Sequence, residues 1–189
     1  MKLMITNSKI ILIYFILIAI YGIMEMFLQL LFSKWKFRKS RDKGLILIMV
    51  PFYLSIYLAP IEHILIKNNL HFILIAVGFT ILILGIILRI LALLKLRENF
   101  SMVVESSDKN SLVVNGMYKY IRHPLYMASL FIAVSGCILF TCIITWIFFI
   151  LTLISILKRI KIEETFLISR FAEYGDYMKK TYKLIPFLY

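Results

Sequence analysis

The order of apolar and polar positions predicts a chain that crosses a membrane several times. Three apolar runs, at about residues 10–32, 44–61 and 70–94, are separated by short polar segments. A membrane-spanning α-helix needs about 20 apolar residues, because it rises about 1.5 Å per residue across a hydrocarbon layer about 30 Å thick. Each run is therefore predicted to form one transmembrane helix.

A fourth apolar block, at about residues 125–157, is too long for one span and short for two spans with a loop. We predict a tight helical hairpin that turns near residues 140–144, and a single tilted helix with a re-entrant piece is the alternative. The predicted fold class is an all-α, polytopic membrane protein. It has about five transmembrane helices, including the C-terminal hairpin, and short cytoplasmic helices.

Basic residues in the connecting segments predict the orientation of these helices. The segment between the first two spans contains Lys34, Lys36, Arg38, Lys39, Arg41 and Lys43. Residues 95–122 and the tail after 158 are also basic, whereas the segment after the second span carries only Lys67. Because short cytoplasmic loops are enriched in Lys and Arg, we expect the N-terminus outside and the C-terminus in the cytoplasm.

The composition agrees with a single membrane domain over residues 1–189. The chain is 62% hydrophobic, with a mean hydropathy of +0.92, whereas soluble domains are roughly half apolar. Its net charge of +12 could indicate nucleic acid in a soluble protein. Here the basic residues lie at the ends of apolar runs, where topology and anionic headgroups account for them. The Lys- and Ile-rich composition is typical of a low-GC microbe, so we expect its inner or plasma membrane as the location.

Two local features argue against other classes. Lys2 and Lys9 precede the first apolar run, but that run is too long for a signal peptide and lacks a small-residue cleavage site, so we interpret it as a retained span. Cys137 and Cys142 lie in an apolar stretch without metal-ligand spacing. They are predicted to be packing residues, and no metal site is predicted.

Charged residues inside the apolar runs are functional candidates, because they are costly in a membrane. Arg89 lies late in the third run, where it either contacts a substrate or extends to the interface. Glu25 and Gln29 lie four positions apart in the first run. They indicate either helix packing or a portal for a lipid substrate.

The segment 115–126 gathers aromatic and basic side chains at the start of the fourth block. Its candidate site residues are Tyr118, Arg122, His123, Pro124 and Tyr126. An Asn-Gly step marks a turn, and Pro124 suits the first turn of a helix, where no backbone donor is lost. Arg122 and His123 then precede a helix N-terminus, which favours an anion such as a carboxylate. An interfacial belt of aromatic and basic residues is the alternative.

A second candidate segment, residues 158–164, lies where the last span leaves the membrane. Arg159 and Glu163 are four positions apart on one helix face, as in an ordinary surface ion pair. Glu163 and Glu164 are nevertheless acids in a basic neighbourhood, where topology does not require them. We expect them to bind a cation, a hydroxyl or an arginine. The aromatic tail that follows is predicted to be an interfacial helix that could also act as a lid.

Together these residues predict a cytoplasmic pocket for a zwitterionic ligand, and the chain contains no GxGxxG, P-loop, HExxH or GxSxG motif. The RHPxY motif at residues 122–126, the hydrophobic hairpin and the Glu163-Glu164 pair resemble the isoprenylcysteine carboxyl methyltransferase family. The resemblance covers about residues 85–186, including the step at 99–101. It assigns a catalytic core to residues 85–189 and leaves residues 1–69 as an N-terminal two-helix part. The family's frequent glycine is replaced at Ala128-Ser129.

The resemblance implies S-adenosylmethionine as methyl donor. The residues that would bind it are Tyr118, Arg122, His123, Pro124, Tyr126, Glu163 and Glu164. We hypothesise that Arg122 or His123 meets the carboxylate of the donor and that a glutamate meets its amino group or ribose. Arg159, held by Glu163, would orient the acceptor, so these two residues are the catalytic candidates. Arg159 and Arg89 are the substrate candidates.

The acceptor is expected to be lipophilic or small, with O-methylation of a carboxylate favoured. Phospholipid N-methylation and thiol S-methylation are the alternatives within the superfamily. A non-catalytic membrane protein and a nicotinamide-dependent membrane reductase are alternatives from other classes. The expected partners are the methyl donor, the acceptor and the lipid bilayer, with no nucleic acid.

Overall fold

The computed structural model describes residues 2–32, 43–66, 70–96 and 112–186. Within them the secondary structure is helical, apart from one isolated parallel bridge between Ile121 and Tyr182. The elements are α1 (Lys2–Phe32), α2 (Lys43–Ile66), α3 (Phe72–Leu96), the short 3₁₀-helix η2 (Gly116–Lys119), α4 (Pro124–Leu139), α5 (Thr145–Arg170) and α6 (Tyr174–Lys179). The all-α prediction is therefore confirmed.

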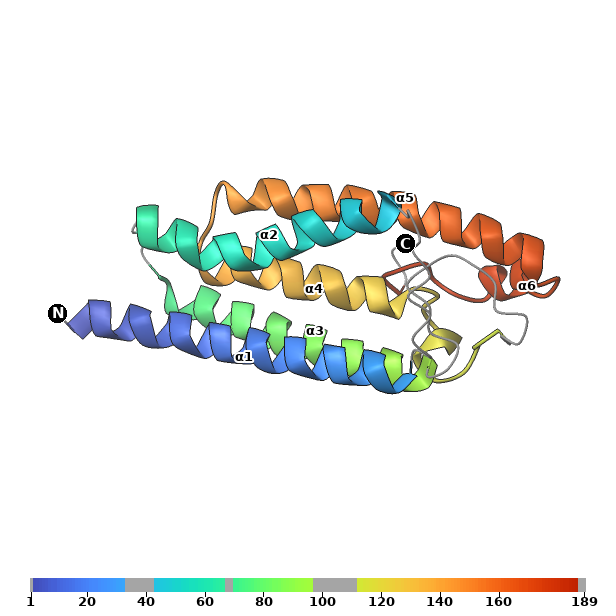
Figure 1. Ribbon diagram of the computed structural model, residues 1–189, viewed down its shortest axis with the longest axis horizontal. Coiled ribbons are helices and arrows are strands. Elements are labelled where there is room, and N and C mark those ends of the chain that lie inside the picture. The colour runs from blue at the N-terminus through green and yellow to red at the C-terminus, as the bar shows by residue number, and fades with distance from the viewer. Residues whose placement is uncertain (1, 33–42, 67–69, 97–111, 187–189) are drawn as a thin grey trace.

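The five long helices run side by side along the long axis of the molecule (Figure 1). The central helix, α4, packs against α2, α3 and α5, and α1 packs against α3. The N-terminus and the turn from α4 to α5 lie at one end, here called the hairpin end (Figure 1). The start of α4, the end of α5 and α6 lie at the other end, here called the site end.

Among the residues that the structure describes, three helices are long and apolar enough to cross a membrane, over Asn7–Leu28, Ile46–Ile66 and Phe72–Leu96. The predicted hairpin is confirmed, because α4 ends at Leu139 and α5 begins at Thr145. α4 is apolar but shorter than a full span, so the total of five spans stays a prediction. The orientation also stays a prediction, because the basic segment after α1, Lys67 and the step at 99–101 lie outside the described residues.

Two glycines allow α3 and α4 to pack closely. A Cβ atom at Gly78 would lie 2.6 Å from the Cβ of Leu139, and one at Gly85 would lie 2.9 Å from Cγ1 of Ile132. Membrane helices often associate through small residues of this kind. In lipid there is no hydrophobic driving force between apolar side chains, so close van der Waals packing stabilises the contact instead. The close contact fixes α4, and with it the start of α4 at the site end.

The second helix is longer than the apolar pattern predicts. The prediction ends it at residue 61, before Glu62 and His63, but α2 continues to Ile66. Both polar residues are buried. Glu62 accepts hydrogen bonds from the backbone at the start of α5, so its charge is satisfied inside the protein instead of ending the helix.

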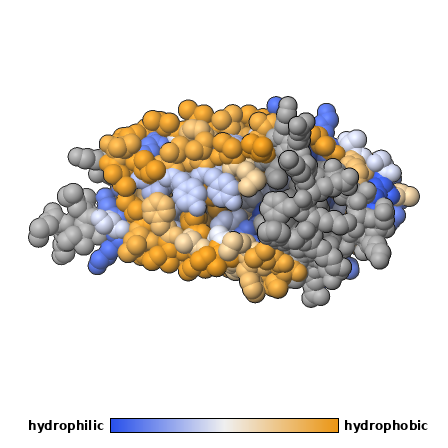
Figure 2. Space-filling view, viewed as in Figure 1, coloured by the Kyte–Doolittle hydropathy of each residue, from blue (hydrophilic) through white to orange (hydrophobic). Residues whose placement is uncertain are grey.

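The outer surface carries a broad belt of exposed aliphatic and aromatic side chains from α1, α2, α3 and α5. Figure 2 shows this belt along two ridges, with paler, more hydrophilic side chains in a recess between them. Exposed apolar patches of this extent mark contact with lipid or partners, and here they agree with helices of transmembrane length.

Candidate functional site

The site end of the bundle gathers nearly all of the predicted site residues from three stretches of the chain. The first stretch is η2 with the start of α4, the second is the end of α5, and the third is α6 with the segment that follows it (Figure 1). Their side chains are joined by hydrogen bonds and ion pairs between residues roughly 40 to 60 positions apart.

The entry into α4 has the local structure that the sequence predicts. Gly116 adopts a φ of +65°, which suits glycine because a Cβ atom is unfavourable in this region. The 3₁₀-turn that follows buries Tyr118. Pro124 lies in the first turn of α4, and His123 is the residue before it, without a side-chain cap on the helix. The first amides of α4 thus face the site end beside the His123 ring.

The C-terminal segment runs along the residues before α4. The amide of Arg122 donates to the carbonyl of Tyr182 at 2.8 Å, and the amide of Tyr182 donates to the carbonyl of Tyr120 at 2.9 Å. The Tyr177 hydroxyl donates to the carbonyl of Tyr118 at 2.6 Å. Burial raises the pKa of Tyr177 to about 12, so its phenol keeps the proton that this bond needs. The predicted aromatic tail is therefore attached to the site through its backbone.

Glu164 is the centre of an ionic cluster. Its Oε1 atom accepts a 2.8 Å hydrogen bond from Nε of Arg122 and lies 3.4 Å from Nε2 of His123, and its Oε2 atom lies 3.6 Å from Nζ of Lys183. Burial alone would raise the pKa of Glu164, but the hydrogen bonds from His123 and Arg122 outweigh it and lower the pKa to about 2. Glu164 is therefore a carboxylate bound to three cationic or polar partners.

Arg122 also donates hydrogen bonds to the tail. Its Nη1 atom donates to the carbonyl of Met178 at 3.0 Å, to the carbonyl of Thr181 and to the Thr181 hydroxyl. The guanidinium thus joins α5 to the segment after α6. The sequence gives a cue for Arg122 but none for Thr181 or Lys183, because neither belongs to a periodic or charged motif.

Glu163 differs from its neighbour, although the two share the motif. Its Oε2 atom is buried and has no hydrogen-bond partner among the described residues. Nδ1 of the His123 ring lies 3.8 Å from that oxygen, which is beyond hydrogen-bond distance. A buried carboxylate oxygen without a donor is uncommon in folded proteins and indicates an absent partner.

Arg159 is buried instead of forming an exposed surface pair. The Tyr126 side chain lies within hydrogen-bonding reach of both Arg159 and Glu163. The ring of Tyr126 also lies beside that of His123, with centroids 5.8 Å apart. Four of the predicted residues, namely His123, Tyr126, Arg159 and Glu163, therefore come together.

Arg89 turns inward and forms a largely buried ion pair with Glu25 of α1. Its Nη2 atom lies 2.6 Å from Oε1 of Glu25. Its Nη1 atom donates to the carbonyl of Leu125 at 3.1 Å and to the hydroxyl of Ser129 at 3.0 Å. The interpretation that Arg89 extends to the interface is wrong, because its charge is neutralised within the bundle. The one sequence cue for this pair is that both residues are charged and lie within apolar runs, where charged residues are rare.

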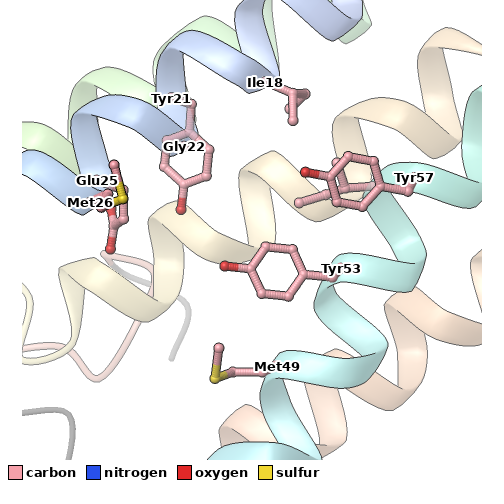
Figure 3. Close-up of a pocket in the computed structure, with 9 residues that line it drawn as sticks. Ile18, Tyr21, Gly22, Glu25, Met26, Met49, Tyr53 and Tyr57 are labelled. Carbon is pink, nitrogen blue, oxygen red and sulfur yellow. The ribbon is translucent and has the colours of Figure 1, made fainter. Parts of the chain in front are cut away.

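A recess between α1 and α2 reaches the Glu25 end of this ion pair. It encloses about 150 Å³ and is lined by Ile18, Tyr21, Gly22, Glu25, Met26, Met49, Tyr53, Ile56 and Tyr57. Figure 3 shows Tyr21 of α1 and Tyr53 of α2 pointing into the space between the helices, with Glu25 and Met26 at one end. The recess lies within the two spans, so lipid is the surrounding solvent.

Comparison with known families identifies the pattern. A sequence model described as "Isoprenylcysteine carboxyl methyltransferase (ICMT) family" matches residues 74–169, which is half of the chain. The chain belongs to this family. The matched region contains α4 and most of α3 and α5, and it therefore includes both halves of the RHPxY and Glu-Glu signature.

Curated relatives agree with this assignment. A protein-S-isoprenylcysteine O-methyltransferase of Tribolium castaneum is 32% identical over 123 residues, which cover 59% of this chain and 41% of the relative. One from Schizosaccharomyces pombe is 34% identical over 117 residues, covering 60% and 49%. The chain spans about half the length of these relatives.

A solved structure extends the similarity to nearly the whole chain. The structure of the eukaryotic intramembrane Ras methyltransferase ICMT superposes with a TM-score of 0.69 and 25% sequence identity. The superposition covers 96% of this chain and 68% of the solved one. α1 and α2, which lie before the region of the family match, thus also have counterparts in a relative.

Proposed function

We propose that this protein is an S-adenosylmethionine-dependent methyltransferase that methylates the carboxylate of a lipophilic acceptor. The site end would face the cytoplasm, where the methyl donor is dissolved. The observation that carries the proposal is the buried, unpartnered oxygen of Glu163 beside His123 at the start of α4. That oxygen lies on the signature by which the chain matches its family.

The residues at the site end fit the chemical groups of this donor. S-adenosylmethionine carries an ammonium group and a carboxylate, and its ribose carries two hydroxyls. Glu163 offers an acceptor for an ammonium or a hydroxyl, which would satisfy its free oxygen. His123 and the uncapped amides of α4 offer donors for a carboxylate. Tyr118 and Tyr126 supply ring faces next to these groups.

We assign Arg122 and Glu164 to holding the site closed. The donors of Arg122 go to Glu164 and to the tail, so this arginine would act on the methyl donor by positioning His123 and the tail. The tail bonds to the backbone of residues 118–123 and could exclude water from the site. Desolvation strengthens the electrostatic contacts inside such a site and protects a charged donor from hydrolysis.

The transfer itself requires alignment more than acid–base chemistry. The bound donor supplies an electrophilic methyl group on a sulfonium. An acceptor carboxylate forms the new C–O bond while the C–S bond breaks, and its negative charge cancels the charge of the sulfonium without transfer of a proton. We propose that Arg159 holds the acceptor carboxylate and that Glu163 keeps the donor in line with it. Positioning of this kind can account for much of a rate enhancement.

We further propose that the acceptor reaches the site from the bilayer through the recess between α1 and α2. The recess is lined by apolar and tyrosine side chains and ends at Glu25. Arg89 connects Glu25 to Leu125 and Ser129, which belong to the first turns of α4. Arg89 would thus act on the acceptor indirectly, by fixing the wall between the recess and the site.

Isothermal titration calorimetry of detergent-purified protein with S-adenosylmethionine tests the donor site. We expect binding by the wild type, loss of at least about tenfold in affinity in Glu163→Gln, and little change in Glu173→Gln, which alters an exposed acid on the same side of the protein. A folded wild type that binds neither S-adenosylmethionine nor S-adenosylhomocysteine would contradict the proposal.

A second experiment identifies the chemistry of the acceptor. Purified protein in vesicles receives a donor with a labelled methyl group and one of three lipophilic acceptors: a carboxylate, a thiol or a phosphatidylethanolamine. We expect label on the carboxylate, in a product that releases volatile methanol on treatment with base. Label on the amine or thiol alone would support transfer of a methyl group but overturn the O-methylation assignment.

A further inference from the structure

Glu62 of α2 holds the start of α5 at the hairpin end. Its Oε1 atom accepts hydrogen bonds from the amides of Ile143 and Ile144 at 2.6 and 2.8 Å. Its Oε2 atom accepts bonds from the amide and the hydroxyl of Thr145 at 2.7 and 2.6 Å. The residue at the N-cap position of α5, Ile144, provides no side-chain cap. The cap of α5 therefore comes from a different helix.

This arrangement explains an acid at a position where lipid makes charge costly. The first amides of a helix have no partner within the helix, and in an apolar layer they cannot turn to water. A carboxylate suits them, because its hydrogen bonds are charge-assisted and it faces the positive end of the helix dipole. Glu62 is only 7% exposed, so these four bonds, and not water, stabilise most of its charge.

The turn between α4 and α5 is also docked on α2. The Cys142 thiol points to the carbonyl of Ala59 at 3.5 Å, and a Cβ atom on Gly136 would lie 3.1 Å from the Cβ of Ala59. Thr141 has a φ of 52°, a left-handed conformation that is strained for a β-branched residue and persists only where the surroundings enforce it. The turn is therefore held in one position relative to α2.

The other end of the same helix carries the chemistry. α5 is continuous from Thr145 to Arg170, and at a rise of about 1.5 Å per residue Glu164 lies roughly 28 Å beyond Thr145. A helix transmits a displacement along its axis to every residue on it. The contact of Glu164 with Arg122 is 2.8 Å, so a shift by one residue's rise would break it.

We propose that Glu62 is a positioning residue for methyl transfer, which sets the height of α5 and so places Glu163 and Arg159 against His123 and Tyr126. This inference rests on the proposed function of the site end. Glu62 contacts neither donor nor acceptor, because it lies at the opposite end of the bundle. Its effect reaches them through the helix that carries the signature acids.

Two variants separate tethering from simple capping. Glu62→Ala removes both the cap and the link to α2. Adding Ile144→Asp supplies a carboxylate at the N-cap position of α5 itself and restores only the cap. Thr152→Val is the matched control, because it alters a fully buried polar residue of α5 whose hydroxyl bonds within the helix, to the carbonyl of Phe148. Glu62→Gln, which keeps one acceptor oxygen, replaces the alanine variant if that variant does not fold.

The readouts are thermal stability and affinity for S-adenosylmethionine in detergent. We expect Glu62→Ala to lose stability and at least about tenfold in affinity, since a displaced α5 moves Glu163 away from the donor and a hydrogen bond of a charged group is lost. The double variant should recover stability but not affinity, and Thr152→Val should keep the wild-type affinity. Unchanged affinity in Glu62→Ala, or affinity restored by Ile144→Asp, would overturn the proposal.

A distance measurement tests, independently of donor binding, whether Glu62 fixes the position of α5 relative to α2. Spin labels at Ile46 on α2 and Lys161 on α5, which are both exposed, report the relative height of the two helices near the site end. We expect Glu62→Ala to shift or broaden that distance and Thr152→Val to leave it unchanged. An unaltered distance would disprove the tether, whereas a wild type that binds no donor would refute the proposed function alone.

Discussion

Nε of Arg122 donates a 2.8 Å hydrogen bond to Oε1 of Glu164, across 42 positions of sequence. Each side chain is 8% exposed. The RHPxY motif and the Glu-Glu pair are thus joined by a buried ion pair. The adjacent pair, His123 and Glu163, does not reach hydrogen-bond distance. The signature therefore combines one pair joined by a hydrogen bond with one pair that is not.

Breaking the closed pair should destabilise the site end. Glu164→Gln leaves Arg122 buried without its carboxylate, and loss of one partner of a buried ion pair costs roughly 3–5 kcal/mol. Asp176→Asn is the control, because it breaks an exposed pair with Lys179, where the expected cost is below about 1 kcal/mol. Thermal unfolding in detergent measures both. Equal losses in the two variants would show that the Arg122 pair is not buried in solution.

The same carboxylate predicts how stability depends on pH. Glu164 has its pKa lowered from 4.5 to about 2 by His123 and Arg122, so its ionised form stabilises the fold. Because the folded pKa is depressed, this stabilisation is complete above about pH 5 and is lost as the pH falls toward 2. The difference in melting temperature between wild type and Glu164→Gln should be constant from about pH 6 to 8 and shrink in acid. A difference that shrinks between pH 8 and 6 would point to another group.

The ion pair between Arg89 and Glu25 should behave as a unit. Arg89→Met or Glu25→Gln alone leaves a buried charge and should cost roughly 3–5 kcal/mol, whereas the double variant should cost clearly less than the sum. A double-mutant cycle on thermal stability measures the coupling. Additive losses would indicate that the two side chains do not interact in the membrane.

Close packing of α3 on α4 gives a prediction about single methyl groups. Gly78→Ala places a Cβ atom 2.6 Å from that of Leu139, so the helices must separate and the protein should lose about 1–3 kcal/mol. Gly22→Ala, where no atom lies within 4 Å, should be neutral or slightly stabilising because alanine favours helix. Melting curves measure both effects. An unchanged melting temperature in Gly78→Ala would show that α3 and α4 are packed less closely at Gly78 than the structure indicates.

The recess between α1 and α2 predicts a selective effect on the acceptor. Tyr53→Phe with Tyr57→Phe removes two hydroxyls from its lining without changing its shape. We expect a rise of about 5- to 150-fold in the KM for the acceptor and an unchanged Kd for the methyl donor, since loss of each of the two neutral hydrogen bonds costs about 0.5–1.5 kcal/mol. Tyr120→Phe, at a residue exposed at the site end, is the control. An unchanged KM would exclude this route.

The sequence predicts much of the fold because lipid imposes a simple rule. Apolar runs of the right length must be helices, so the predicted span at 10–32 lies within α1, which begins eight residues earlier, and the one at 70–94 agrees with α3 to within two residues. The rule fails at Glu62, because the apolar run ends at residue 61 while α2 continues to Ile66. Its partners are backbone amides roughly 80 positions away, and no local pattern encodes them.

The candidate site shows the same limit. Proline, histidine and paired acids in motifs identify His123 and Glu163, and the structure brings both together with Tyr126 and Arg159. In the sequence the two glutamates are adjacent and identical, so the motif does not distinguish their roles. Only the surrounding donors distinguish them, since Arg122 and Lys183 both turn to Glu164.

The backbone pairing of residues 120–123 with 182–183 has a consequence for biosynthesis. The helices α1 to α3 can insert as soon as they leave the ribosome, because each is an apolar helix of transmembrane length. The site cannot exist until Lys183 has been synthesised, since the carbonyls of Tyr182 and Lys183 receive the amides of Arg122 and His123. A nascent chain is therefore already embedded in the membrane while it is still incapable of binding a methyl donor. Ribosome-arrested chains that stop after Arg170 would be integrated and inactive.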